Sequence, residues 1–315
     1  MKYLVGVDVG GTTVKLGIFT EEAQIVSKWE IKTRTEENGR FILPDIAESV
    51  LENLQKNGID KADVKGLGIG VPGAVQPDGS VHSCVNLGWG RVMVKDEMEQ
   101  LTGFTVYPAN DANIAALGEA WQGGGKGCAN TVMVTLGTGV GGGIIVNGKI
   151  VVGKSGFGGE IGHMKMKMDE TETCGCGKKG HYEAYASATA LIEQTRQAMD
   201  RHPESILHKV VQLYGLNGKT VFTAAKQGDK VAVGVLNKYI KYVGTGLVNF
   251  ANLFYPEVII VGGGVSRQGD VLVKPLQRYV SRNVYGSKYN PKIKVAAAEL
   301  GNDAGIIGAA CLAMN

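Results

Sequence analysis

The first part of the chain alternates short apolar runs with polar turns. The apolar runs predict β-strands over residues 3–9, 14–19, 24–32 and 67–71. Between the last two runs, residues 41–56 carry an apolar residue every three or four positions, which predicts a helix with one buried stripe. The opening strand leads directly into Gly10-Gly11-Thr12-Thr13. The sequence therefore predicts a three-stranded meander whose first turn is rich in glycine.

The same pattern starts again in the middle of the chain. Asn110-Asp111 can cap a helix that runs to about Trp121. A strand over residues 131–136 then leads into a second glycine-rich turn at 137–143. The other elements that we expect are strands at 144–146, 150–152 and 258–261, and helices at about 184–200, 220–227, 231–254 and 304–314.

Strand, glycine turn and strand thus occur twice, although without sequence identity between the two copies. This repetition predicts two α/β domains with a cleft between them, each presenting its glycine turn to the cleft. We expect a smaller domain of residues 1–110 and 300–315, and a larger one of residues 111–299.

Glycine makes up 47 of the 315 residues, against a usual share of about 7%. The excess lies in short clusters, which indicates backbone held close to a ligand. In the first cluster, Gly10, Gly11, Thr12 and Thr13 offer backbone N–H groups and hydroxyls suited to phosphate. Asp8 precedes them and is suited to holding magnesium through water. An ordinary hairpin turn with a satisfied aspartate fits the same residues.

The second cluster has glycine at five of the seven positions from Gly137 to Gly143, with Thr138 among them. A hairpin turn needs one or two glycines, so the excess favours backbone packed against phosphate. The string resembles a dinucleotide-binding fingerprint, but that motif requires a helix directly afterwards. Residues 144–146 predict a strand instead, so we reject the dinucleotide interpretation and, with it, a nucleotide-dependent dehydrogenase.

Two further glycine motifs give weaker evidence for phosphate or nucleotide binding. Residues 148–155 match the P-loop pattern G-x-x-x-x-G-K-S, yet residues 149–152 predict a strand and no helix is expected after Ser155. We therefore do not assign phosphate binding to Lys154. The apolar run 258–261 ends in three glycines, and Gly263 and Gly264 could form a shelf under an adenine ring or only a tight connection.

Composition narrows the class of protein. A net charge of +3 without a basic block gives no reason to expect nucleic acid or an anionic membrane as a partner. The uncharged stretch 127–148 is long enough to span a bilayer, but its glycines indicate a buried hairpin. Five cysteines, including the pair Cys174 and Cys176, favour a reducing compartment and a metal over disulfides. With no signal-peptide pattern after Met1, we expect a cytoplasmic protein.

With three glycine turns in this order, the chain resembles the actin-like ATPase and sugar-kinase superfamily, and more closely the ROK family of repressors and sugar kinases. The resemblance rests on three segments: Leu136 to Gly143, Gly159-Glu160-Ile161-Gly162-His163, and Cys174 to Glu183. The opening from Gly6 to Lys15 looks most like bacterial ROK glucokinases. The resemblance implies an α/β, two-domain actin-like (ribonuclease H-like) fold with an interdomain cleft.

The resemblance also implies a reaction, the transfer of the γ-phosphoryl group of MgATP to the 6-hydroxyl of glucose. Asp111 would be the catalytic base, in place of the plain helix cap that the residues alone allow. The helix N-terminus should keep Asp111 ionised, so that positioning matters more than a raised pKa. The nucleotide and its magnesium would be held by residues of the three turns: Asp8, Gly10, Gly11, Thr12, Thr13, Lys15, Gly137, Thr138, Gly139, Gly263 and Gly264.

The sugar hydroxyls would be received by Asn86, Asn110, Asp111, Glu160, His163 and Glu183. A structural zinc ion would be held by His163, Cys174, Cys176 and His181, and it would direct Glu160, His163 and Glu183 toward the sugar. The sequence departs from the family here, because His181 stands where a third cysteine is usual. An exposed His181 without any metal is the alternative. The family also implies a homodimer.

Two other functions compete with a glucokinase. The acceptor could be another hexose or amino sugar, such as N-acetylmannosamine, N-acetylglucosamine, fructose or allose. The family also contains sugar-responsive repressors, which need a DNA-binding domain, usually N-terminal. Because the first glycine turn begins close to residue 8, and because Asp111 is present, we expect a kinase.

Overall fold

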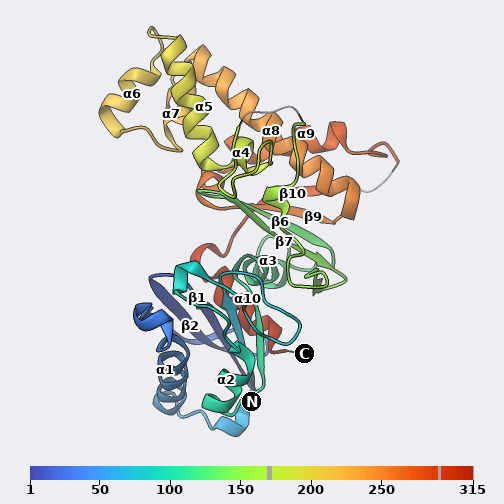
Figure 1. Cartoon of the computed structure of the whole chain (residues 1–315). Helices are drawn as coiled ribbons and strands as arrows, with labels where there is room; N and C mark the ends of the chain where they lie inside the picture. Colours follow the sequence, from blue (N-terminus) through green and yellow to red (C-terminus); the bar gives the residue numbers. More distant parts are fainter. Residues whose placement is uncertain (169–171, 290–291, 315) are drawn as a thin grey trace. The chain divides into compact units, whose positions relative to one another are not determined.

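The computed structural model describes residues 1–168, 172–289 and 292–314. The chain divides into two compact units (Figure 1). The first consists of residues 1–127, 143–159 and 299–315, and the second of residues 128–142 and 160–298. Compared with the domain ranges expected from the sequence, the first unit also takes in 111–127 and 143–159. The chain therefore passes between the units four times, once within a single β-strand.

The first unit is built on a five-stranded mixed sheet with the order β3-β2-β1-β4-β5. Its strands are β1 (Tyr3–Val9), β2 (Thr13–Thr20), β3 (Ile25–Lys32), β4 (Val64–Val71) and β5 (Val106–Asn110). The expected meander is present, since β1 pairs antiparallel with β2, and β2 with β3. Strand β4 pairs parallel with both β1 and β5. The carboxyl ends of β1 and β5 therefore point the same way, which places Asp8 and Asn110 at one edge.

Helices cover both faces of this sheet: α1 (Ile42–Lys56), α2 (Val94–Thr102), α3 (Asp111–Gln122) and α10 (Ala304–Leu312). Alternate residues of β1 serve the two faces, because Val5 and Val7 join the core under α1 and α2 while Leu4 packs with α10. On the α10 face, Gly6 has no room for a side chain. A Cβ there would lie 2.0 Å from the carbonyl oxygen of Ile306. Helix α10 thus packs directly on the backbone of the sheet.

A second sheet has the order β10-β9-β6-β7-β8, and most of it belongs to the second unit, whereas β8 and the later half of β7 belong to the first. The strands of this sheet are β6 (Thr131–Leu136), β7 (Val140–Val146), β8 (Lys149–Ile150), β9 (Val258–Gly262) and β10 (Lys294–Ala297). Strand β9 pairs parallel with β6 and β10, and β7 pairs antiparallel with β8. The unit boundary between Gly142 and Gly143 falls inside β7.

Helices make up much of the rest of this unit: α4 (Glu183–Ala186), α5 (Ala188–Arg201), α6 (Leu207–Tyr214), α7 (Thr220–Lys226), α8 (Lys230–Phe254) and α9 (Asp270–Asn283). The long α8 packs against α4, α5, α7 and α9. The single helix expected over 184–200 is corrected to two, because Ser187 has extended backbone and its hydroxyl accepts the Ala190 N–H to cap α5. In the described part of the chain, no helix is both long and apolar enough to cross a membrane.

Candidate active site

The first glycine turn joins β1 to β2. Gly10 N–H donates to the Thr13 carbonyl oxygen at 3.1 Å, and the Thr33 hydroxyl donates to the Gly10 carbonyl oxygen at 2.7 Å. Gly11 and Thr12 are exposed at its tip. A Cβ on Gly11 would meet the Asn86 carbonyl oxygen at 3.5 Å, so the Asn86 loop lies beside the turn. The turn is fixed from behind while its tip stays accessible, as a phosphate cradle requires.

Asp8 lies below this turn, opposite Lys15 in the β1–β2 register. The pKa of the Asp8 carboxyl is raised to about 6, first by burial and then by the negative charge of Asp111, while the positive charge of Lys15 acts to lower it. The carboxylate is packed against the start of α10, where a Cβ on Gly305 would lie 2.3 Å from Asp8 Oδ2. A buried carboxylate whose proton affinity is raised by a neighbouring carboxylate marks a place that a divalent cation would stabilise.

Asp111 is the first residue of α3. The Asn110 side chain caps this helix by accepting the N–H groups of Ala112 and Asn113 at 2.9 and 3.3 Å. The Asn110 amide also donates to the Gly73 carbonyl oxygen at 3.0 Å. Because the cap is made by Asn110, the plain-cap role is already filled at this helix. The Asp111 carboxylate accepts the adjoining Ala112 N–H at 2.8 Å.

The expectation that the pKa of Asp111 is not raised needs a correction. The side chain is exposed at its surface, yet the protein atoms around it raise the pKa of its carboxyl by desolvation. The hydrogen bonds from Ala112 and Asn110 act in the opposite direction but do not outweigh this effect. The helix N-terminus therefore does not decide the pKa alone. A carboxylate of raised proton affinity is the better general base.

The second and third glycine turns meet within the second unit. Gly263 directly follows β9 with φ of +81°, and a Cβ there would lie 2.5 Å from the Leu136 carbonyl oxygen at the end of β6. Gly137 is held by the Ala188 N–H, which donates to its carbonyl oxygen at 2.8 Å. The Thr189 hydroxyl donates to the Thr138 carbonyl oxygen at 2.8 Å. Thr189, at the start of α5, is a residue that the sequence reasoning did not single out.

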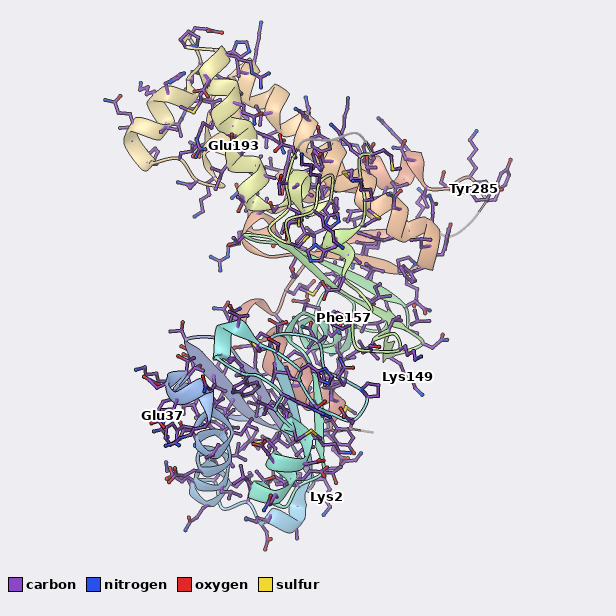
Figure 2. All side chains as sticks on the ribbon, viewed as in Figure 1. Lys2, Glu37, Lys149, Phe157, Glu193 and Tyr285 are labelled. Atoms are coloured by element: carbon purple, nitrogen blue, oxygen red, sulfur yellow. The ribbon has the colours of Figure 1, made fainter. Side chains whose placement is uncertain are left out.

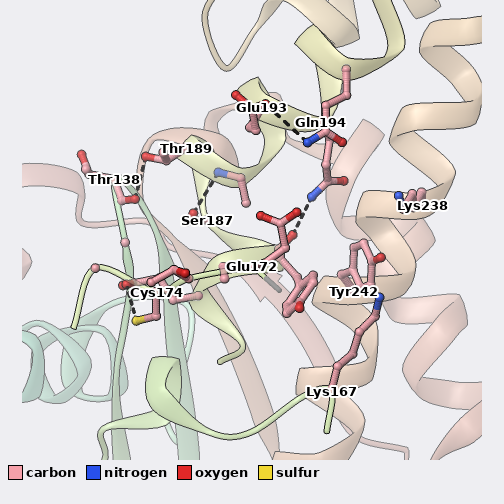
Figure 3. Close-up of a pocket in the computed structure, with 18 residues that line it drawn as sticks. Thr138, Lys167, Glu172, Cys174, Ser187, Thr189, Glu193, Gln194, Lys238 and Tyr242 are labelled. Atoms are coloured by element: carbon pink, nitrogen blue, oxygen red, sulfur yellow. Dashed lines mark hydrogen bonds between the residues drawn. The ribbon is translucent and has the colours of Figure 1, made fainter. Parts of the chain in front are cut away.

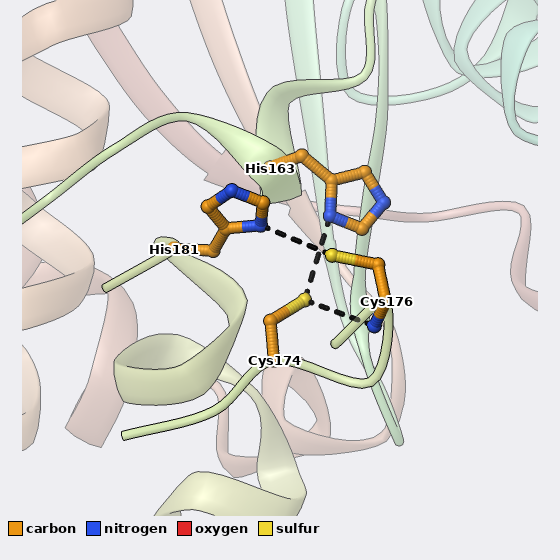
Figure 4. A group of neighbouring side chains, drawn as sticks. All are labelled: His163, Cys174, Cys176 and His181. Atoms are coloured by element: carbon orange, nitrogen blue, oxygen red, sulfur yellow. Dashed lines mark hydrogen bonds between the residues drawn. The ribbon is translucent and has the colours of Figure 1, made fainter. Parts of the chain in front are cut away.

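The four metal-ligating candidates come together in the structure (Figure 4). Their ligand atoms all lie within 4.8 Å of one another. Cys174 Sγ is 3.5 Å from His163 Nδ1, and Cys176 Sγ is 3.3 Å from His181 Nδ1. A tetrahedral ion with ligand bonds of about 2.0–2.3 Å has ligand atoms about 3.3–3.8 Å apart. The donor set and these two distances fit such an ion. His181 and Cys174 are buried, whereas His163 and Cys176 are exposed.

Glu183 connects this cluster to the second glycine turn. Its Oε2 accepts the Val140 N–H at 2.9 Å, and Cys174 Sγ lies 3.2 Å from its Oε1. Gly139 must be glycine here, since a Cβ would lie 2.2 Å from Glu183 Oε2. On the other side of the cluster, Glu160 Oε2 is 3.7 Å from His163 Nε2. Both acids expected to receive sugar hydroxyls therefore contact the Cys/His cluster.

A cavity of about 740 Å³ opens beside these groups in the second unit (Figure 3). Thr138, Gly139 and Glu183 line it together with Cys174. Its other side is formed by residues of α5 and α8 and by the segment before the cysteines, including Lys167, Glu193, Lys238 and Tyr242. The second glycine turn and the Cys/His cluster thus border one solvent-filled space.

The P-loop match behaves as its context predicts. Lys149 and Ile150 form β8, and residues 151–160 contain no helix. Ser155 instead ties this loop to residues 73–76, since its carbonyl oxygen accepts the Gln76 amide at 2.8 Å. Phe157 projects from the same loop with 65% of its surface exposed (Figure 2). The second glycine turn is shorter than the expected 137–143, because strand β7 begins at Val140 and takes in the last three glycines. A strand, and not a helix, therefore follows the turn, which supports the rejection of a dinucleotide fold.

These features define the class of protein. The model of the ROK family matches residues 4–315, so the chain belongs to the ROK family. The expected fold class is confirmed: an α/β chain with two mixed sheets, of the actin-like ATPase type.

Named relatives follow from the same comparisons. A glucokinase from Halalkalibacterium halodurans is 41% identical over 313 residues, covering 98% of this chain and 93% of the relative. One from Streptomyces coelicolor is 37% identical over 320 residues, covering 99% and 98%. A solved ROK glucokinase from Streptomyces griseus, in complex with glucose and AMPPNP, is 37% identical with a TM-score of 0.76 over 99% of both chains.

Proposed function

We propose that this protein is an ATP-dependent kinase that phosphorylates glucose at its 6-hydroxyl. The observation that carries the proposal is Asp111, which begins a helix already capped by Asn110 and has a raised pKa. The full-length similarity to proteins named glucokinase, at 37–41% identity, supports both the reaction and the acceptor. The glucose and AMPPNP complex of the Streptomyces griseus relative supports the same pair of substrates.

In the proposed reaction, Asp111 accepts the proton of the sugar 6-hydroxyl as the oxygen attacks the γ-phosphorus and the bond to the ADP oxygen breaks. The raised pKa suits this role, because the carboxylate needs affinity for the proton that it receives. Asn110 keeps the helix end in place through its two N–H contacts and its bond to Gly73. The protein thereby supplies orientation and a base, which is most of what phosphoryl transfer requires.

We assign the nucleotide to the three turns. Gly10, Gly11, Thr12, Thr13 and Lys15 would contact its phosphates in the first unit, and Gly137, Thr138 and Gly139 in the second. Gly263 and Gly264 would border the adenosine. Magnesium, when bound, neutralises phosphate charge, and Asp8 would hold it through water. The raised pKa of Asp8 supports this assignment, because a nearby cation favours the ionised carboxylate.

We assign the sugar hydroxyls to Asn86, Asn110, Asp111, Glu160, His163 and Glu183. Glu183 and Glu160 both contact the Cys/His cluster. The four residues of this cluster, His163, Cys174, Cys176 and His181, would bind a zinc ion. Zinc, when bound, would have a structural role: it would hold its four ligands in a rigid tetrahedral arrangement and would supply no nucleophile. A homodimer and a cytoplasmic location remain predictions.

The acceptor is tested by a coupled assay of ADP release over a panel of hexoses and amino sugars. We expect glucose to be used with kcat/KM at least about tenfold above every other common hexose, because acceptors placed around the whole ring are left unpaired by an analogue that lacks a hydroxyl. Faster turnover of N-acetylmannosamine or N-acetylglucosamine would overturn glucose but keep the kinase. No ADP release with any sugar would favour a repressor.

A further inference from the structure

Glu119 is a fully buried acid that the proposed reaction does not use. It lies on α3, two helical turns after Asp111, and its side chain is 0% exposed. Both of its oxygens accept backbone N–H groups. Oε2 accepts Gly124 N–H at 3.0 Å; Oε1 and Oε2 share Glu299 N–H at 2.9 and 3.1 Å; and Oε1 accepts Leu300 N–H at 2.8 Å. All of these hydrogen bonds come to the carboxylate from backbone N–H groups.

The two segments that Glu119 binds are chain crossings. Gly124 belongs to the glycine segment 123–127, after which the chain enters the second unit at Cys128. Glu299 and Leu300 are the first residues after the chain returns from that unit at Ala298. One carboxylate therefore joins an outgoing and a returning segment that are 175 residues apart or more in sequence.

The backbone around Glu119 reinforces this junction. The Glu119 carbonyl oxygen accepts the N–H groups of Gly123 and Gly125 at 3.1 and 3.0 Å. Gly123 admits no side chain, because a Cβ there would lie 2.0 Å from Glu119 Oε2. The residue directly before Glu119, Gly118, is packed so closely on α10 that a Cβ would lie 2.2 Å from the Ala304 carbonyl oxygen. Helix α3 is thus held firmly at the same end.

We propose that Glu119 is a positioning residue for phosphoryl transfer, a clamp that fixes two of the four crossings to the helix that carries Asp111. The inference rests on the proposed kinase function. A change in the second unit that moves either crossing is transmitted through Glu119 to α3, and so to the base. Because reacting groups must be placed to within about 1 Å, a slack clamp lowers the rate with little effect on the affinity for nucleotide.

Glu119→Gln tests the clamp with almost no change in volume. Since both oxygens accept N–H groups, either orientation of the amide turns its NH₂ group against a backbone donor. We expect kcat for glucose to fall at least about tenfold while KM for MgATP stays within about threefold, the pattern of an interaction lost in the transition state. Glu119→Asp keeps both oxygens but reaches less far, and should give a smaller loss. Glu299→Gln is the control, with the same chemical change on an exposed side chain next to the clamp.

A second measurement does not depend on activity. Lys126 is exposed within the glycine segment, so trypsin cleavage before Gly127, followed by mass spectrometry without substrates, reports its opening. We expect cleavage at least about fivefold faster in Glu119→Gln than in wild type and in Glu299→Gln, with one cooperative melting transition retained. If Glu119→Gln does not fold, Glu119→Asp is judged by the same two criteria.

A folded variant with wild-type kcat overturns the positioning role, whatever its cleavage rate. A lowered kcat with wild-type cleavage overturns the clamp as its cause. If the wild-type enzyme phosphorylates no sugar, the proposed function fails and the positioning role with it, whereas faster cleavage in the variant would still identify Glu119 as a structural clamp of the crossings.

Discussion

The base region and the Cys/His cluster are built in different ways. Around Asp111, each functional group lies at the end of a strand or helix and is held by backbone hydrogen bonds. The segment that carries His163, Cys174, Cys176 and His181 has almost no regular structure, and the ligand atoms of these four side chains lie close to one another. The first arrangement is supported by the fold itself. The second needs a cation at its centre to offset the cost of gathering four ligands.

The largest expected effect concerns the base. Asp111→Ala should lower kcat by about 10²–10⁴-fold, the usual contribution of a general base, while nucleotide affinity measured by calorimetry barely changes. The melting temperature should also stay close to wild type, because Asn110 makes the helix cap. The matched control is Asp270→Ala, which removes a carboxylate from the first residue of another helix, α9, and should leave kcat unchanged. More than about a tenth of wild-type kcat in Asp111→Ala would exclude it as the base.

The cluster should respond to loss of its metal in a way that the base region does not. Purified protein should carry about one zinc per chain, and Cys174→Ser or Cys176→Ser should lose it with at least about a tenfold loss of activity. Proteolysis should then accelerate after Lys165 and Lys178, but not after Lys126. Cys128→Ser, outside the cluster, serves as control. Elemental analysis that finds no zinc in untreated protein would refute the zinc assignment.

The stability of the region around Asp8 should depend on pH, which separates it further from the Cys/His cluster. The raised pKa of Asp8 means that the folded, metal-free protein disfavours the ionised form, so stability is fullest below pH 4 and is partly lost as pH rises through about 6. Asp8→Asn removes this cost. In EDTA at pH 7.5 it should raise the melting temperature by about 2–4 °C or more, with the gain vanishing near pH 4. An equal gain at both pH values would show that the charge of Asp8 is not the cause.

The smallest expected effect concerns Lys154, which belongs to neither region. Lys154→Ala should leave KM for MgATP within about threefold, because we assign the phosphates to the Gly10 and Gly137 turns. A true P-loop lysine acts as a point charge on phosphate, and its loss would be severe. The assay is initial-rate kinetics with varied MgATP, and a hundredfold rise in KM would restore the P-loop interpretation.

The strands next to glycine turns were predictable from sequence because an apolar run followed by glycine is a local signal. Helices α2, α6 and α9 were missed, as were β5 and β10. In α9 the buried stripe of Leu272, Leu276 and Val280 is regular, but Pro275 inside it argues against a helix. Helix α2 buries few apolar residues over nine positions. Short elements of this kind are stabilised by tertiary packing, which the local pattern does not contain.

The candidate site divides in the same way. His163 and His181 could be grouped with the cysteines because ligand types cluster in sequence, and the structure brings all four together. The raised pKa values of Asp8 and Asp111 could not be predicted, because both arise mainly from burial, which the packing of the folded chain decides. Glu119 gave no signal at all. Its partners at residues 299 and 300 become neighbours only once the chain has returned from the second unit.

The contact of α10 with the bare backbone of β1 affects the order in which the chain can fold during its synthesis. During translation, β1 leaves the ribosome well before the helix that covers its Gly6 face. The ranges of the second unit, which end at Ala298, are complete before that helix exists. We therefore expect the sheet of the nascent chain to stay half covered until α10 has been made. Chaperone contact should then concentrate on the N-terminal strands, the reverse of the usual N-terminal-first order.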